Sequence, residues 1–427
     1  MKRLVFILML AALTLSCSTT PVAAQTRHDD LERKVNEMMD GMTLHQKVAQ
    51  LFVIQIDRNN SEEEILVQDS LVRMGLGGVI IMRGPVKPFM KRANEMQSHS
   101  SIPLLFCTDA EWGAAMRFYE YLPYPRQLQL SKIPDAEPML YQMGLNVARE
   151  LSDLNIHVNF APVADIAENP LDEEYSSQRN FSHGVQHVTS YADAYMRGLQ
   201  DGGVSACGKH FPSHGDTRID AHVEQPLFYY TREQMDSTYL VPFKRMIEDG
   251  VDFIMLGHHA VSGIDSTMIP MSISPKCVRD LLKGDLGFKG IVVTDALGMG
   301  GVANGRTPME VMLAAYRAGV DMLLMPHNPI AGIKAIADSV SCGAFPLDEL
   351  DARVHKVLML KAEKGFFDKG FSRRTRHVAA KVRRARRRDS RLIEKMNRAI
   401  ALADSAAVQS AAYDPTLVLD RGRDIEK

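Results

Sequence analysis

One segment of the chain concentrates groups that can move protons. Between Lys209 and His222, fourteen residues include three histidines, two aspartates and a lysine, together with Gly and Pro. Gly and Pro interrupt regular structure, and so many ionisable groups are seldom buried without partners. Asp220 and His222 stand two residues apart, so the carboxylate can orient an imidazole whose ordinary pKa near ~6.5 suits proton transfer at neutral pH. We therefore predict a functional loop that carries acid/base chemistry.

The elements that would position this loop are short apolar runs separated by helical segments. The runs are rich in Val, Ile, Leu and Phe and alternate little, which is typical of parallel strands buried on both faces. Eight such runs predict an α/β fold, a TIM-type (β/α)8 barrel. A doubly wound open sheet is the alternative, although no GxGxxG follows the first run. The runs are Gln50–Ile56, Gly78–Met82, Pro103–Asp109, His157–Asp165, Val204–His210, Phe253–His258, Gly290–Asp295 and Val320–Pro326.

The intervals between these runs carry helix signals. Apolar residues recur at helical spacing, and Thr231 to Gln234 fits a capping box that opens a helix ending before Gly250. The expected helices are Glu62–Met74, Glu137–Leu154, Val188–Leu199, the helix from Thr231 to Glu248, Pro308–Ala318 and Leu347–Lys364.

Polar residues stand where five of the predicted strands end. In a barrel of this kind, the active site lies at the C-terminal ends of the strands, and a ring of polar groups there is difficult to explain by packing. The residues are Asp109 with Glu111, Asp165, Lys209 with His210, His258 with His259, and Asp295.

Two chemistries could use this ring. Barrel metallohydrolases usually carry His-x-His at the end of the first strand, whereas this chain has Ile54-Gln55-Ile56-Asp57, although a metal-dependent hydrolase stays open as an alternative. Glycoside hydrolysis needs a nucleophile and an acid/base on either side of the anomeric carbon. Asp295 is the natural nucleophile, and the pair Asp220 and His222 is the proton donor. We expect no metal and no cofactor.

Four motifs carry a family resemblance. They are Lys209–Thr217 continued by Asp220-Ala221-His222, Val293–Met299, Asn159–Asp165 and Asp321–Pro326, and they resemble the β-N-acetylhexosaminidase branch of glycoside hydrolase family three over about residues 30 to 366. The resemblance implies a retaining mechanism in which Asp295 attacks, His222 is the acid/base and Asp220 positions it. It also implies that the sugar is held by Asp109, Arg179, Lys209 and His210 and that Met299 lines the same pocket. His258 would either bind the sugar as well or be a buried histidine that is bonded to the backbone.

The chain departs from the family pattern at several positions. Ser213 replaces the usual Gly between Pro212 and His214, which would stiffen the loop. Trp112, the only tryptophan, stands where a small residue is usual and would either stack on a second sugar or cap the barrel. Many members carry a second α/β domain, whereas residues 367–427 indicate a basic linker and a helical tail, with a helix at Leu392–Ala407. This segment is either a simple tail or the remnant of such a domain.

The N-terminus resembles an export signal. Lys2 and Arg3 precede an apolar run that is too short to span a bilayer. Cleavage after Ala24 and lipidation of Cys17 are both open, so residues 1–24 lie outside the barrel assigned to residues 30–366 and membrane attachment through Cys17 is one outcome. We expect a periplasmic protein or an outer-membrane lipoprotein.

Composition bounds the partners. The chain is 45% apolar and 24% charged, with a net charge of −2, which does not favour nucleic-acid binding. Ten Lys or Arg residues lie between Arg373 and Arg391; this run is either a solvated linker or a contact for an anionic surface or polymer. The expected partner is a carbohydrate, from N-acetylglucosaminides or peptidoglycan fragments. A family-three hydrolase of another sugar, such as a β-glucosidase, and a sugar-binding lipoprotein without activity are the alternatives.

Overall fold

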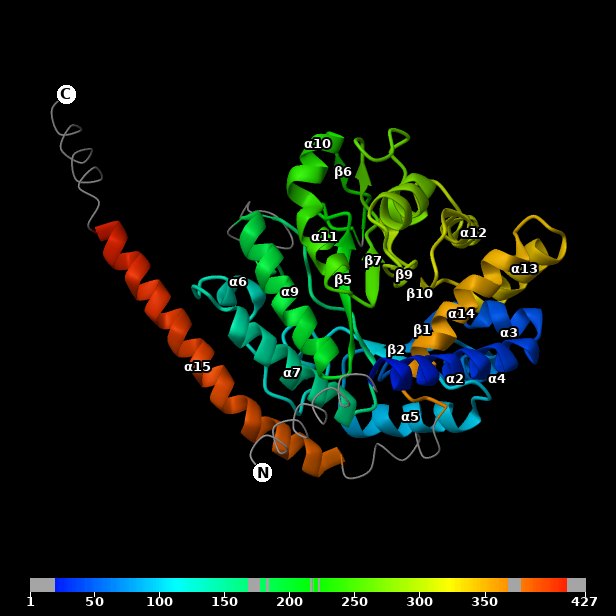
Figure 1. The fold of residues 1–427 in the computed structure, drawn as a ribbon, viewed down its shortest axis with the longest axis horizontal. Helices are drawn as coiled ribbons and strands as arrows, with labels where there is room; N and C mark the ends of the chain where they lie inside the picture. Colours follow the sequence, from blue (N-terminus) through cyan, green and yellow to red (C-terminus); the bar gives the residue numbers. More distant parts are fainter. Residues whose placement is uncertain are drawn as a thin grey trace, which may run out of the picture.

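A parallel ring of eight strands forms the centre of the molecule (Figure 1). The structure is a computed structural model that describes residues 20–167, 177–181, 184–215, 217, 219–221, 223–367 and 378–412. The strand order is β10-β1-β2-β3-β4-β5-β7-β9, and a parallel bridge between Val293 and Met322 brings β9 to the segment of β10 and so nearly closes the barrel. The strands are β1 Phe52–Ile56, β2 Gly78–Ile81, β3 Leu105–Thr108, β4 Val158–Asn159, β5 Ser205–Phe211, β7 Phe253–Leu256, β9 Ile291–Thr294 and β10 Leu323–Leu324.

Seven of the eight predicted apolar runs contain one of these strands, and the run Val204–His210 covers all of β5 except Phe211, so the predicted α/β barrel is confirmed. A separate parallel pair, β6 (Leu227–Phe228) and β8 (Ala260–Val261), lies outside the ring on the loops that follow β5 and β7. All the ring strands are parallel, and their carboxyl ends therefore meet at one rim.

Helices surround the barrel (Figure 1). Three of the expected helices begin at capping boxes, at Ser61, Thr231 and Thr307. The helices are α2 Thr20–Asp40, α3 Leu44–Ala49, α4 Glu62–Arg73, α5 Val86–His99, α6 Gln127–Leu130, α7 Glu137–Asp153, α9 Val185–Asp201, α10 Arg232–Gln234, α11 Val241–Glu248, α12 Pro308–Ala318, α13 Pro329–Ser341, α14 Leu347–Glu363 and α15 Val378–Ala412.

The helix expected from Thr231 to Glu248 is not continuous. Its capping box is present, but a π-helical segment, Met235–Tyr239, separates α10 from α11. Pro242 stands at the start of α11. Because proline has no backbone N–H and its ring crowds the preceding turn, the α-helical ladder cannot run unbroken through this position.

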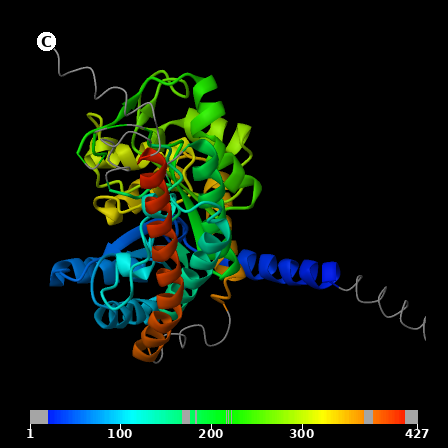
Figure 2. The same cartoon turned by 90° about the vertical axis from the view of Figure 1, so that its left-hand side faces the viewer.

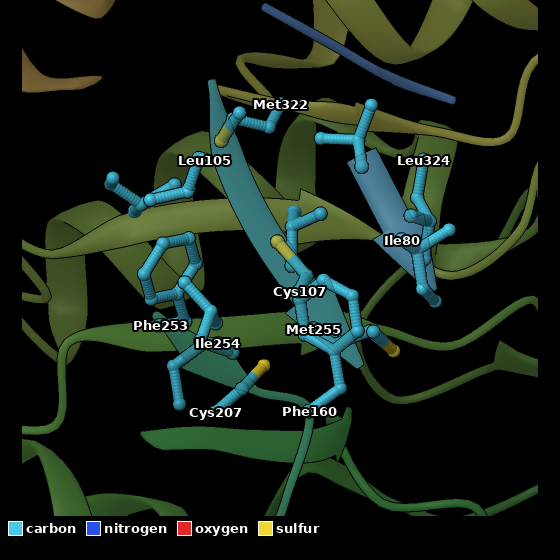
Figure 3. Packing of buried hydrophobic residues seen from close by; sticks show 14 of the residues in the cluster. Ile80, Leu105, Cys107, Phe160, Cys207, Phe253, Ile254, Met255, Met322 and Leu324 are labelled. Carbon is cyan, nitrogen blue, oxygen red and sulfur yellow. The ribbon is translucent and has the colours of Figure 1, made fainter. Parts of the chain in front are cut away.

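Apolar side chains fill the barrel interior (Figure 3). Phe160, Cys207 and Phe253 are almost completely buried there. The upper members of this core, Ile80 and Leu324 among them, also form part of the floor of the pocket described below. Cys107, Cys207 and Cys277 are free and buried, whereas Cys342 is exposed.

Helices α7 and α9 approach each other closely beside β4 and β5. A Cβ on Gly198 would lie 2.1 Å from the carbonyl oxygen of Tyr141, and a Cβ on Gly144 would lie 2.5 Å from that of Tyr195. Only glycine allows this separation at both positions. The close crossing fixes α7, which supports the site from outside through Glu150.

The C-terminal helix α15 runs along one side of the barrel, against α7 and α6 (Figure 2). The sequence predicted a helix only from Leu392, whereas the structure has one continuous helix from Val378, so most of the basic run is helical. Its buried residues Val382, Ala385, Asp389 and Met396 follow helical spacing. The arginines between them are mostly exposed, which explains why the run reads as polar in sequence.

The amino-terminal prediction cannot be placed in the fold, because residues 1–19, including Cys17, lie outside the described residues. The described chain starts in α2, which projects from the barrel (Figure 2) and packs against α14. Among the helices that the structure describes, none is both long enough and apolar enough to cross a membrane.

A buried carboxyl joins α15 to the strand-end loops. Glu150 of α7 is fully buried, and its Oε2 accepts a hydrogen bond from the N–H of Ala114 at 2.9 Å. Burial, followed by the neighbouring Asp389, raises the pKa of Glu150 well above its ordinary value. Asp389 is also fully buried and pairs with Arg388, with 2.7 Å between Nε and Oδ1.

We predict that Glu150→Gln weakens the pH dependence of stability. The folded protein keeps the Glu150 proton to a higher pH than the unfolded chain does, so the stability that this group contributes is present below its ordinary pKa and is lost as pH rises through the raised folded-state pKa. Glutamine keeps an oxygen for Ala114 and needs no proton. The melting temperature of the wild type should therefore fall more between pH 5 and pH 8 than that of the variant.

The exposed Glu363 provides the control. Glu363→Gln should follow the wild-type pH dependence, because an exposed carboxyl loses little of its hydration when the chain folds. An identical pH slope in wild type and Glu150→Gln would contradict the assignment of a buried protonated carboxyl.

Candidate active site

A pocket of about 500 Å³ opens at the carboxyl ends of the strands. The polar part of its wall comes from the ends of β3, β5, β7 and β9. The larger, apolar part includes side chains that follow β2, β9 and β10. The residues that line the pocket include Asp109, Glu111, Arg117, Arg179, Lys209, His210, His258, Asp295 and Met299.

The ammonium group of Lys209 is the centre of the polar half. Its Nζ lies 2.9 Å from Asp109 Oδ1 and 2.8 Å from Glu111 Oε1, and the side chain is only 3% exposed. Burial alone would lower the pKa of Lys209, but the two carboxylates overcome it and raise that pKa. Lys209 is therefore a permanent cation at the bottom of the pocket.

The two carboxylates beside Lys209 each have a second cation. Asp109 pairs with Arg117, and Glu111 binds Arg179 through two hydrogen bonds of 3.0 and 2.9 Å. Burial acts to raise both carboxyl pKa values, but the neighbouring cations outweigh it: the pKa of Asp109 lies well below its usual range, and that of Glu111 falls to about 2. Both are thus ionised and fixed in orientation.

The loop that carries Arg179 is held to the loop after β3. The Arg126 guanidinium lies over the Trp112 ring, 4.5 Å from its centre, and donates to the carbonyl oxygen of Ser177 at 2.7 Å. Of the two roles considered for Trp112, this contact fits the cap, because the arginine occupies one face of the ring and Trp112 does not line the pocket.

A bulge in β5 directs two consecutive side chains into the pocket. Gly208 pairs with Ile254 and Phe211 with Leu256, so β5 has one residue more than β7 over this stretch. In a regular strand, Lys209 and His210 would point to opposite faces, yet both line the pocket. The peptide bond between them is cis.

His210 connects two aspartates. Its Nδ1 lies 2.7 Å from Asp165 Oδ2, and its Nε2 lies 3.9 Å from Asp295 Oδ2. Since an ionised carboxylate only accepts, Nδ1 carries the hydrogen. Asp165 Oδ1 also accepts from the backbone N–H of His210 at 3.0 Å, so Asp165 fixes the imidazole that faces Asp295.

The Asp295 carboxylate faces the pocket and is 21% exposed. Its Oδ1 accepts from the N–H of Ala296 at 2.7 Å. Burial acts to raise its pKa, but His210, His258 and this hydrogen bond together lower it. Asp295 is therefore ionised at neutral pH, as a nucleophile must be.

His258 and Met299 both lie in the pocket wall. The Nε2 of His258 lies 3.0 Å from the carbonyl oxygen of Ala296, and its Nδ1 lies 2.8 Å from the Ser272 hydroxyl. A carbonyl only accepts, so Nε2 is the donor in its contact with Ala296. Both nitrogens thus have protein partners, and His258 supports the segment beside Asp295.

The loop that follows β5 brings Asp220 to the same rim. The adjacent Ala221 lines the pocket, and its carbonyl oxygen accepts from the N–H of Gly301 at 3.0 Å. His222 lies outside the described residues, so the predicted proton donor is not placed. Ser213, the departure from the family glycine, has φ +113°, a strained conformation for a residue with a side chain, and its Oγ accepts from Ile166 N–H at 3.2 Å.

Seven of the nine predicted site residues therefore line one pocket, and Asp220 neighbours it. Sequence reasoning missed Arg117, which lies eight residues beyond Asp109. The only available signal was an arginine in the same strand-end loop. Within the described ranges, no three His, Cys, Asp or Glu side chains converge in a way that could hold a metal ion.

Comparisons with known proteins agree with this geometry. A β-hexosaminidase of Nitrosospira multiformis is 32% identical over 275 residues, which cover 62% of this chain and 77% of the relative. A β-hexosaminidase of Tolumonas auensis is 31% identical over 297 residues, which cover 67% of this chain and 86% of the relative. A solved glycoside hydrolase family 3 β-N-acetylglucosaminidase from Paenibacillus sp. str. FPU-7 superposes with a TM-score of 0.71 and 28% identity, covering 80% of this chain and 69% of that one.

Barrel and pocket define a glycoside hydrolase. The family described as Glycosyl hydrolase family 3 N terminal domain matches residues 43–360, and the chain belongs to this family. The resemblance inferred from the four motifs is confirmed.

We predict that Lys209→Met destabilises the protein strongly. The change leaves two buried carboxylates with one cation fewer, and removing one partner of a buried pair typically costs about 3–5 kcal/mol. Denaturant unfolding measures the loss. In the control, Lys334→Met removes an exposed partner of Asp338 and should leave the unfolding free energy nearly unchanged. Equal effects of the two substitutions would contradict the role given to Lys209.

Proposed function

We propose that this protein is an exported, retaining exo-β-N-acetylglucosaminidase that removes terminal β-linked N-acetylglucosamine from peptidoglycan fragments or related oligosaccharides. The observation that carries the proposal is the pocket itself: an ionised Asp295 faces a space of about 500 Å³ whose opposite wall is a set of fixed charges. Such a wall suits the hydroxyl groups of one sugar ring. The name of the solved Paenibacillus relative supports the choice of N-acetylglucosamine, and the names of the other two relatives support a hexosaminidase.

The reaction has two steps. Asp295 attacks the anomeric carbon and forms a covalent bond while the bond to the leaving oxygen breaks and that oxygen takes a proton from His222. Water then gives a proton to His222 and attacks the same carbon, which releases Asp295. Two displacements return the original configuration. Asp220 holds His222, and Asp109, Arg179, Lys209 and His210 bind the sugar hydroxyls.

The proposal that the protein is exported rests on its amino-terminal sequence. Two basic residues, a short apolar run and the small residues before Gln25 support a periplasmic location or an outer-membrane lipoprotein attached through Cys17.

We predict that the wild-type protein hydrolyses an aryl β-N-acetylglucosaminide at least about 100-fold more efficiently than the matching glucoside, because a site built for a polar substituent discriminates strongly against its absence. Steady-state kinetics give kcat/KM for each. Proton NMR of the first product should show the β anomer. Preference for the glucoside would favour the β-glucosidase alternative, and ligand binding without turnover would favour the sugar-binding lipoprotein.

A further inference from the structure

A groove opens beside the active-site pocket and has no part in the mechanism above. Its volume is about 580 Å³, and it shares Gly298 and Met325 with the pocket. The walls come from the end of β1, from α4 and from the segment after β10. We define this groove by Ile54, Gln55, Asn60, Ser61, Glu63, Glu64, Val67, Gln68, Leu71, Gly298 and residues 325–330.

The position of the acid/base loop indicates which way the leaving group extends. Ala221, next to both members of the Asp220 and His222 pair, is hydrogen-bonded to Gly301 in the loop after β9. A Cβ on Gly301 would lie 2.6 Å from the Ala221 oxygen, so the two segments are in direct contact. A proton donor must stand beside the oxygen that it protonates. We therefore take the leaving group to extend along the loop after β9, which also contains Gly298.

From the loop after β9, the groove lies toward β10 and β1, the next two strands around the ring. β10 follows β9 through the bridge of Val293 and Met322, and β1 pairs with β10. These are the strands whose ends form the groove. A residue that both cavities share, Gly298, has no side chain to separate them, and the atoms nearest to its Cβ position belong to His327 and Met325.

We propose that this groove binds an uncharged sugar ring joined to the N-acetylglucosamine that is removed, so that the preferred substrates are neutral oligosaccharides rather than carboxylate-bearing peptidoglycan fragments. The proposal rests on the proposed function and narrows its substrate class.

The groove contains side chains of the kinds that bind a sugar ring. Val67 and Ile330 are apolar yet 43% and 36% exposed, so they offer surface to the C–H face of a ring. The amides of Gln55, Asn60 and Asn328 can meet hydroxyl groups at its edge. Mostly apolar walls with a few polar groups are typical of ligand sites.

The wall behind this surface is already fixed. Met325 and Asn328 both have φ +47°, and the Asn328 side chain caps α13 by accepting from Ala331 N–H at 3.2 Å. Gln68 donates to the carbonyl oxygen of Gln55 at 3.2 Å, which ties α4 to β1. A preformed wall loses little conformational entropy on binding.

Charge selects against an acidic leaving group. Glu63 and Glu64 line the groove, and none of the described residues that line it is Lys or Arg. Glu64 accepts from the backbone N–H of Ser61, and this bond and Asn60 lower its pKa, so it is ionised at neutral pH. A carboxylate on the second ring, such as the lactyl group of muramic acid, would be repelled.

The test uses a substitution that fills the groove without changing the residues that bind the N-acetylglucosamine. Two substrates share the same N-acetylglucosamine: N,N′-diacetylchitobiose, whose leaving group is a ring, and β-N-acetylglucosaminyl fluoride, whose leaving group is one atom. In Val67→Trp, the ratio of kcat/KM on the disaccharide to that on the fluoride should fall about tenfold. The matched control is Leu66→Trp on the same helix, since Leu66 is 66% exposed and outside the groove; its ratio should equal that of the wild type.

A charge change provides the second measurement. Glu63→Lys should raise kcat/KM on N-acetylglucosaminyl-β-1,4-N-acetylmuramic acid several-fold relative to diacetylchitobiose. Equal ratios in the two tryptophan variants, or a wild-type preference for the muramic acid disaccharide, would overturn the groove assignment. Failure of the wild type to hydrolyse any of the N-acetylglucosaminides would instead overturn the proposed function.

Discussion

The buried ammonium of Lys209, held between Asp109 and Glu111, is the interaction on which the site depends. Arg117 and Arg179 complete a set of two carboxylates and three cations, of which Lys209 alone contacts both carboxylates. The set has one positive charge in excess, and Lys209 is among the groups that lower the pKa of Asp295 across the pocket. The same charges that are proposed to bind sugar hydroxyls thus help to keep the proposed nucleophile ionised.

The surrounding structure holds these charges in place from two sides. Behind the loop after β3, Glu150 binds Ala114, and Glu150 is in turn covered by Asp389 of α15. Above it, Trp112 and Arg126 join that loop to Ser177, next to Arg179. The tail that follows the barrel therefore contributes to the support of the active site, a role that composition did not suggest.

Much of the fold could be predicted because buried parallel strands leave a plain signal. Continuous apolar runs located all eight strands of the barrel, and because parallel strands end at the same rim, they predicted that Asp109, Lys209, His210 and Asp295 lie together there. Local rules could not predict what depends on tertiary pairing. The bulge between Gly208 and Phe211 is defined by the pairing of β5 with β7. The pairing of Asp109 with Arg117 depends on the path of the loop after β3.

The helix α15 shows a different limit. Its buried positions are few and include a charged residue, Asp389, which is accommodated only because Arg388 and Glu150 meet it. A hydrophobic pattern alone therefore placed the start of the helix at Leu392, fourteen residues after Val378. The roles of Asp220 and His222 rest on sequence and resemblance, since His222 lies outside the described residues.

In the proposed mechanism, Asp295 is the nucleophile of a double displacement. Incubation with 5-fluoro-β-N-acetylglucosaminyl fluoride should slow the second step and leave one sugar covalently attached to the protein. Peptide mapping by mass spectrometry should then find the added mass on the peptide that contains Asp295, and Asp295→Ala should acquire none. A label on another carboxylate, or α-configured product with no label at all, would contradict the account.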